Sequence, residues 1–112
     1  MPDFVTVSID SVPAVPVRDS VGVRVRRLWR SDDSPSGRRA LVLEFDPGAQ
    51  FPFVDVHEPG PEEVFVLDGV FAGLAGEGSV HRRGDFIHCE VGSVHQPSTA
   101  TGGSLFVFYP AG

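Results

Sequence analysis

The chain has 112 residues, a net charge of −6 at pH 7 with histidine counted as neutral, 41% hydrophobic residues and 21% charged residues, which indicates one globular domain with a single core. The acidic balance argues against nucleic acid as a partner, because phosphate groups are bound by basic surfaces. No apolar run approaches the length of a membrane span, the N-terminus lacks the pattern of a signal peptide, and one cysteine cannot form an internal disulfide, so we expect a cytoplasmic protein with no membrane partner.

The N-terminal quarter of the chain predicts strands and a connector. Residues 4–9 alternate between two faces and predict a first strand. Residues 12–17 contain two prolines and predict an extended connector or an edge strand. Residues 21–29 alternate again until the phase slips at residues 27–29, where we expect a β-bulge. Residues 1–16 would then form an N-terminal strand and a proline-rich connector, available as an arm in a dimer.

The rest of the chain consists of short apolar runs between turn residues. Residues 31–37 have the composition of a hairpin loop, and Asp68-Gly69 is the strongest short hairpin signal. The further strands are expected at residues 40–45, 51–57, 62–67, 70–74, 79–82, 85–90 and 105–109. Because no crossover helix separates them, the pattern predicts one all-β domain over residues 1–112, a small antiparallel β-barrel or sandwich.

Two of the four histidines lie in segments that suggest a metal site. Asp55 and His57 are two residues apart and share one face of a strand, and Glu62 follows after a tight turn. His95 is distant in the chain, but distant strands can be neighbours in a closed barrel. Imidazoles with one or two carboxylates suit Fe(II), Mn, Ni, Cu or Zn and leave positions for water or substrate. The alternative for His57 is a solvated loop residue beside a glutamate.

The other polar residues are weaker candidates for a functional site. We interpret His81 as a residue of an exposed strand and Cys89 as a small buried apolar residue. His88 lies two residues before Glu90, which leaves open that it faces the pocket. No serine sits at a strand-to-helix elbow, so no catalytic triad or other catalytic residue is assigned. Strand alternation predicts an apolar pocket lined by Phe65, Phe106 and Phe108.

Two segments resemble the sequence motifs of the cupin superfamily. Residues 84–95 have the spacing of the second motif, a glycine, five residues, Pro-x-Gly, two residues and a histidine, with Glu90 in place of the proline. Residues 48–69 resemble the first motif, Gly…His-x-His…Glu…Gly, with Asp55 in place of the first histidine. Thr99 stands where the second motif ends in asparagine.

From about residue 17 onward, the chain is similar to the cupin domain of ChrR-type anti-sigma factors and of related stand-alone proteins. The segments that carry the similarity are residues 22–23, 28–30, 37–41, 47–52 and 60–69. The resemblance implies a cupin jelly roll, or double-stranded β-helix, with a divalent metal ion such as Fe, Zn, Mn or Ni. It implies as ligands Asp55, His57, Glu62 and His95. Without Asp55, the set resembles the two-histidine, one-carboxylate site of non-haem Fe(II) oxygenases, and a site that has lost its metal is a third outcome.

The resemblance implies two alternative functions. The first is a small metal-dependent dioxygenase that acts on a β-diketone or a phenolic ketone, with the metal as Lewis acid and template. The second is a non-catalytic sensor or small-ligand-binding module related to the anti-sigma factor domains. An anti-sigma role itself is not expected, because the sequence lacks the Cys/His cluster of the zinc-binding domain of those factors. In either case the expected partners are a small molecule and, because cupins commonly dimerise, a second copy in a homodimer.

Overall fold

The structure, a computed structural model, describes residues 4–31, 37–53, 55–56 and 60–110, with only the backbone of residues 55–56. Within these residues one short 3-10 helix, η1 (Ile9–Ser11), precedes the strands β1 (Val15–Pro16), β2 (Val23–Arg30), β3 (Arg39–Phe45), β4 (Asp55–Val56), β5 (Glu62–Ala72), β6 (Val80–Arg82), β7 (Phe86–Cys89), β8 (Val94–His95) and β9 (Gly103–Tyr109). The all-β prediction is confirmed.

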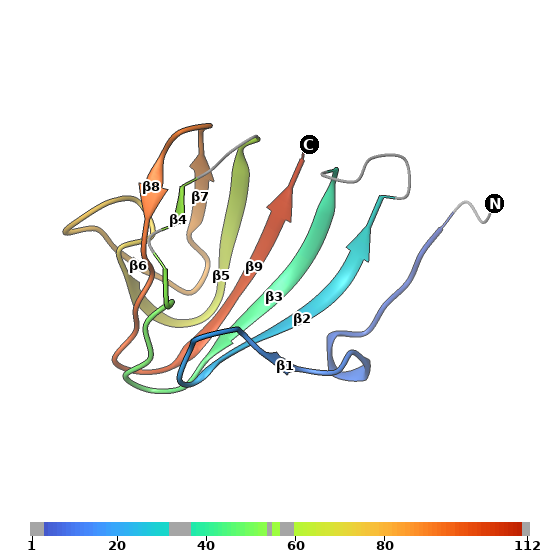
Figure 1. Cartoon of the computed structure of the whole chain (residues 1–112), viewed down its shortest axis with the longest axis horizontal. Helices are drawn as coiled ribbons and strands as arrows, with labels where there is room; N and C mark the ends of the chain where they lie inside the picture. The colour runs from blue at the N-terminus through green and yellow to red at the C-terminus, as the bar shows by residue number, and fades with distance from the viewer. Residues whose placement is uncertain (1–3, 32–36, 54, 57–59, 111–112) are drawn as a thin grey trace.

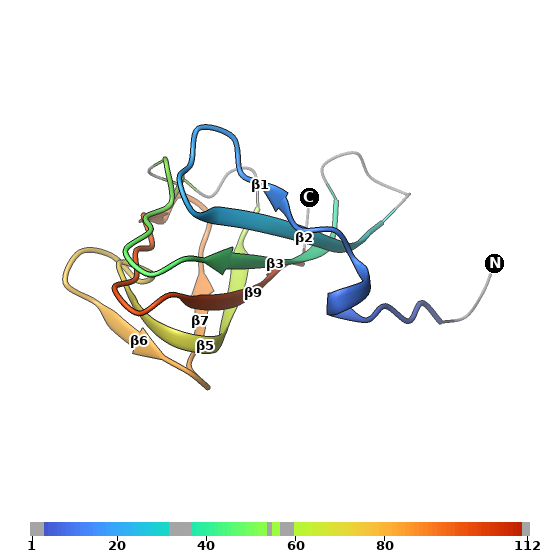
Figure 2. The ribbon, with the colours of Figure 1, turned by 90° about the horizontal axis from the view of Figure 1, so that it is seen from below.

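The strands form two antiparallel sheets. The larger has the order β1-β2-β3-β9-β5-β6, with β7 also paired to β5, and the smaller consists of β4 and β8. β4, β6 and β8 lie on the side of the molecule away from β2 and β3 (Figures 1 and 2). Among the described residues, no helix has the length and apolar composition needed to cross a membrane.

Alternation in β2 shows why these residues form a two-faced sheet. Val23 and Val25 are buried on the inner face. Arg24 and Arg26 point to the outer face, where both reach Glu44 of β3, with nitrogen–oxygen distances of 3.8 Å and 3.1 Å. Successive side chains of a strand point to opposite faces, so one face builds the core and the other carries charge.

Three predictions around β2 are confirmed. The register between β2 and β3 shifts between Arg27 and Trp29, which is the expected bulge. β1 pairs only with β2 among the described strands and forms the edge of the sheet. The hairpin between β2 and β3 is closed by the Ser31 amide, which donates to the Arg38 carbonyl at 2.8 Å, whereas residues 32–36 of the loop lie outside the described residues.

The hairpin predicted at Asp68-Gly69 is wrong, because β5 runs through this position as one strand. Its first part pairs with β9 and β7, its last part pairs with β6, and the register with β9 shifts between Val66 and Asp68. Gly69 has a φ of +85° and lies opposite Gly103 of β9. A Cβ on Gly69 would lie 2.2 Å from the Gly102 carbonyl oxygen. The glycine therefore serves a bend within β5, where its pairing passes from β9 to β6, and not a turn.

Two predicted strands are absent or shorter. Residues 4–8 form no strand, and the 3-10 helix η1 follows them. Arg26 fixes this helix by donating from Nη1 to the carbonyls of Ile9 at 3.3 Å and Val12 at 2.6 Å. Alternation in residues 4–9 does not supply a neighbouring strand, so no strand forms. Of the strand predicted at residues 51–57, the described part forms only β4.

The core lies between the inner faces of the strands. Its most completely buried side chains are Val23, Val64, Val66, Phe71, Leu74, Leu105 and Val107. Phe45 and Phe71 meet edge to face, with ring centroids 5.0 Å apart. Burial of each such side chain contributes about 1.5–3 kcal/mol. This packing holds β2, β5 and β9 in fixed positions around the interior.

Candidate functional site

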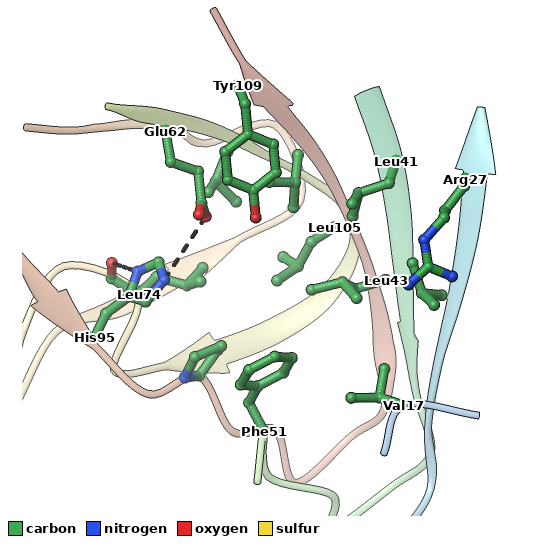
Figure 3. Close-up of a pocket in the computed structure, with 14 residues that line it drawn as sticks. Val17, Arg27, Leu41, Leu43, Phe51, Glu62, Leu74, His95, Leu105 and Tyr109 are labelled. Carbon is green, nitrogen blue, oxygen red and sulfur yellow. Dashed lines mark hydrogen bonds and ion pairs between the residues drawn. The ribbon is translucent and has the colours of Figure 1, made fainter. Parts of the chain in front are cut away.

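The interior contains a cavity of about 160 Å³. Aliphatic and aromatic side chains from β2, β3, β5 and β9 form most of its wall (Figure 3). Polar groups enter it from four residues, Arg27, Glu62, His95 and Tyr109. A mostly apolar cavity with a few converging polar groups is the usual form of a small-molecule site.

Glu62 and His95 meet at one wall of this cavity (Figure 3). Glu62 is the first residue of β5 and His95 the last of β8, and they are only 3% and 7% exposed. Glu62 Oε1 lies 3.7 Å from His95 Nε2. The structure thus brings together two of the four residues predicted as metal ligands, although they are far apart in the sequence.

The other two predicted ligands are only partly described. The backbone of Asp55 pairs directly with that of His95, so β4 lies beside His95. The side chain of Asp55 and the whole of His57 lie outside the described residues. Their roles as ligands stay predictions.

The hydrogen bond at the other ring nitrogen orients His95. Its Nδ1 lies 2.9 Å from the carbonyl oxygen of Leu74, and the sulfur of Cys89 is 3.9 Å away. Because a carbonyl oxygen only accepts, this geometry assigns the proton to Nδ1, and in a neutral imidazole Nε2 then carries the lone pair. Metal-binding histidines usually donate their other N–H to a carboxylate or a backbone carbonyl in this way.

The pair of Glu62 and His95 fits a divalent transition metal. The 3.7 Å between Oε1 and Nε2 is longer than a hydrogen bond, and both atoms carry lone pairs when the imidazole is neutral. Metal bonds of about 2.0–2.2 Å reach both atoms from one point between them. In the part of the chain that is described, no group of three or more potential ligands is found, so these two residues are the described part of a candidate site.

Two further polar side chains line the cavity, and neither was predicted from the sequence as part of a site. Tyr109 directs its hydroxyl into the cavity (Figure 3). The guanidinium of Arg39 lies 3.8 Å from the ring centroid of Tyr109. Arg27 lies on the opposite wall from His95. The alternation of the strands could have predicted both. Arg27 is two residues after the inward-facing Val25, and Tyr109 is two residues after the inward-facing Val107.

The apolar lining predicted from Phe65, Phe106 and Phe108 is wrong. The cavity is lined instead by Leu105 and Val107, and Phe65 is 43% exposed. Both faces of β5 and β9 carry large apolar residues, so alternation alone does not show which face is inside. A shift of one residue exchanges the two faces.

The remaining candidates are also placed. His88 does not face the cavity: its Nε2 lies 3.0 Å from Glu90 and its Nδ1 3.2 Å from Glu63, on the outer face of β5 and β7. Hydrogen bonds raise the pKa of His88, the larger effect coming from Glu90 and the smaller from Glu63. His81 is half-buried on β6, not exposed, and Cys89 is buried as predicted.

The whole chain matches one known family. Its residues 2–112 fit the profile of the ChrR cupin-like domain. The chain belongs to this family. The resemblance found in the two motifs is thereby confirmed, although no curated protein sequence matches this ChrR cupin-like domain significantly.

Solved structures show the same fold. The polyketide cyclase RemF from Streptomyces resistomycificus superposes with a TM-score of 0.80 at 22% identity, covering 96% of this chain and 79% of its own. An acetylacetone dioxygenase from Acinetobacter johnsonii gives 0.78 at 18% identity, covering 98% and 74%. The complex of SigE with the anti-sigma factor ChrR from Rhodobacter sphaeroides gives 0.72 at 20% identity, covering 91% of this chain and 50% of that one. These likenesses show the cupin jelly-roll fold.

Proposed function

We propose that this ChrR cupin-like domain binds a divalent transition metal through Glu62 and His95, completed by His57 and Asp55, and acts as a dioxygenase on a β-diketone or phenolic ketone. The observation that carries the proposal is the orientation of His95. Leu74 accepts from Nδ1, and Nε2 faces the buried carboxylate of Glu62 at the cavity wall. Fe, Zn, Mn and Ni all suit such nitrogen and oxygen donors.

The cavity supports a small carbonyl substrate. Its volume of about 160 Å³ is close to that of an engineered apolar cavity of about 150 Å³ that binds benzene. A bound metal would supply a Lewis acid for the carbonyl or enolate oxygens of the substrate and a template for O₂. The aliphatic walls give the interior of the cavity a mostly apolar lining, into which the Tyr109 side chain also points. Acetylacetone, the substrate in the name of one structural neighbour, is a β-diketone of suitable size.

The second candidate function is a non-catalytic sensor or small-ligand-binding module. It is favoured by the family itself, which is named for ChrR, and by the likeness to the SigE–ChrR complex. The same cavity would then bind its ligand without turnover. Metal content alone does not separate the two functions, whereas oxygen consumption does.

The test is metal reconstitution followed by oxygen uptake. We expect the wild type to retain about one Fe(II), Mn, Ni or Zn per chain and, with one of them, to consume O₂ in the presence of acetylacetone or a hydroxyacetophenone. His95→Ala and Glu62→Gln should each lower metal affinity by at least about 10–100-fold, because loss of a residue that only supports a ligand already costs that much and these variants change the ligand itself.

Matched controls lie next to both residues. Glu63→Gln and His88→Ala change the same residue types on the outer face and should keep the metal. A wild type that retains no metal, or a His95→Ala variant that retains it fully, contradicts the metal site. Bound metal without oxygen uptake on any of these compounds supports the sensor.

A further inference from the structure

The cavity has a cationic side chain on the wall opposite Glu62 and His95. Arg27 of β2 lines the cavity with the inward-facing Val25, and its guanidinium lies across the cavity from the imidazole of His95 (Figure 3). Arg27 is exposed, so the charge lies where the cavity meets solvent. The cavity therefore has an apolar interior with a positive group at one side and a carboxylate and an imidazole at the other.

Arg27 differs from the other arginines in the middle of its strand. Arg24 and Arg26 point to the outer face and form ion pairs with Glu44. The guanidinium of Arg27 forms no hydrogen bond or ion pair with any residue that the structure describes. A guanidinium presents five N–H donors in a planar fork that matches two oxygens sharing one negative charge. Its donors at the cavity are thus available to a ligand.

We propose that Arg27 makes this cavity a site for a small apolar monoanion whose charge is shared by two oxygens, as in a carboxylate or the enolate of a β-diketone. In the metal-free protein, where no metal ion competes for them, the two oxygens pair with the guanidinium, and the apolar body, of about the size of benzene, lies against Leu41, Leu43 and Val107. This ligand class deepens the proposed function and rests on it for the use of the cavity as the substrate site. Binding at Arg27 itself needs no metal.

The charges of the cavity favour this orientation. The carboxylate of Glu62 repels an anionic group from its own wall in the metal-free protein. An anion buried in an apolar interior without a partner is strongly disfavoured, but at Arg27 it is paired and remains near water. The apolar body gains from leaving water, at about 25 cal/mol per Å². An anionic head at Arg27 and an apolar body pointing inward satisfy all three conditions.

The test compares how tightly two ligands of the same shape bind to the metal-free protein. Benzoate and benzamide are nearly isosteric and differ in charge, and both are titrated by calorimetry after chelation of any metal. We expect the wild type to bind benzoate at least about tenfold more tightly than benzamide, because hydrogen bonds to charged groups are the stronger ones. Arg27→Gln should abolish this preference because it weakens benzoate binding far more than benzamide binding, and acetylacetonate should lose affinity in the same variant.

Two further variants keep the test decisive. Arg83→Gln, in the turn between β6 and β7, makes the same change of charge away from the cavity and should keep the preference. Arg27→Lys retains the positive charge but not the planar fork of N–H donors, and it should keep part of the preference for benzoate. Equal binding of both ligands by the wild type, binding of neither, or a preference that survives in Arg27→Gln overturns the proposal. If the preference is present but Glu62 and His95 retain no metal, the proposed function fails and this inference stands.

Discussion

The two histidines of strands β7 and β8 have opposite surroundings. His95 is buried, donates from Nδ1 to a main-chain carbonyl and turns Nε2 toward Glu62 in the cavity wall. His88 is partly exposed on the outer face, and both of its ring nitrogens contact carboxylates. The first arrangement suits a neutral ligand to a metal, whereas the second stabilises an imidazolium.

The surroundings of His88 predict a pH dependence of stability. Hydrogen bonds to Glu90 and Glu63 raise its pKa in the folded protein above the ordinary value of about 6.5. A raised folded-state pKa stabilises the fold fully below the unfolded-state pKa, and this stabilisation is lost as the pH rises through the folded-state value. His88→Gln should therefore lower the free energy of unfolding more at about pH 5.5 than at about pH 9.

Denaturant unfolding of the wild type and the variant at both pH values measures this difference, and an NMR titration of the His88 ring gives its pKa directly. A pKa at or below about 6.5 would show that the two carboxylates do not act on this ring.

At the scale of the elements, the bend in β5 depends on Gly69. Its φ of +85° is unfavourable for other residues, and an added Cβ would collide with the main chain at Gly102. Gly69→Ala should lower the free energy of unfolding by about 2–4 kcal/mol, since strain and collision add. Gly84→Ala is the matched control, with a φ of +91° and no atom within 4 Å of the added Cβ, and should cost only about 1–2 kcal/mol.

Urea denaturation of both variants separates the two costs. Equal destabilisation would mean that backbone conformation alone is responsible, and the close approach of β5 and β9 would then contribute nothing.

The strands that the sequence predicts well are those in which local pattern and long-range pairing agree. The bulge at Arg27 and Trp29 follows from a break of phase within β2 itself. Residues 4–9 alternate equally well but form no strand, because alternation does not supply a partner. Gly69 carries the turn chemistry of a hairpin, yet its conformation is set by a glycine of β9 far along the chain. Long-range contacts therefore decide where local signals mislead.

The sequence predicts those residues of the candidate site that the spacing of the motifs and the chemistry of the side chains point to. Glu62 and His95 were singled out from the sequence, and the structure brings them together. The cavity lining was mistaken because β5 and β9 are apolar on both faces, which removes the contrast that alternation needs. Arg27 was missed because basic residues also alternate on the outer face of β2, so its inward phase did not stand out.

At the scale of the whole molecule, the jelly roll converts distant segments into one cavity. Pairing of β4 with β8 and of β5 with β9 accompanies the approach of Glu62, from the first motif segment, to His95, from the second, at one wall of the cavity. The homodimer expected from the sequence stays a prediction. Apolar side chains that such a dimer would cover are exposed at Phe65 and Phe86 and in the N-terminal segment, where Phe4 is 85% exposed.

The most direct test of the metal site is a crystal structure of the chain reconstituted with zinc or manganese, with anomalous diffraction data on both sides of the absorption edge of the metal. We expect one anomalous peak between Glu62 Oε1 and His95 Nε2, within bonding distance of both. A fully reconstituted crystal with no peak at these atoms, or with its peak at His88, would contradict it.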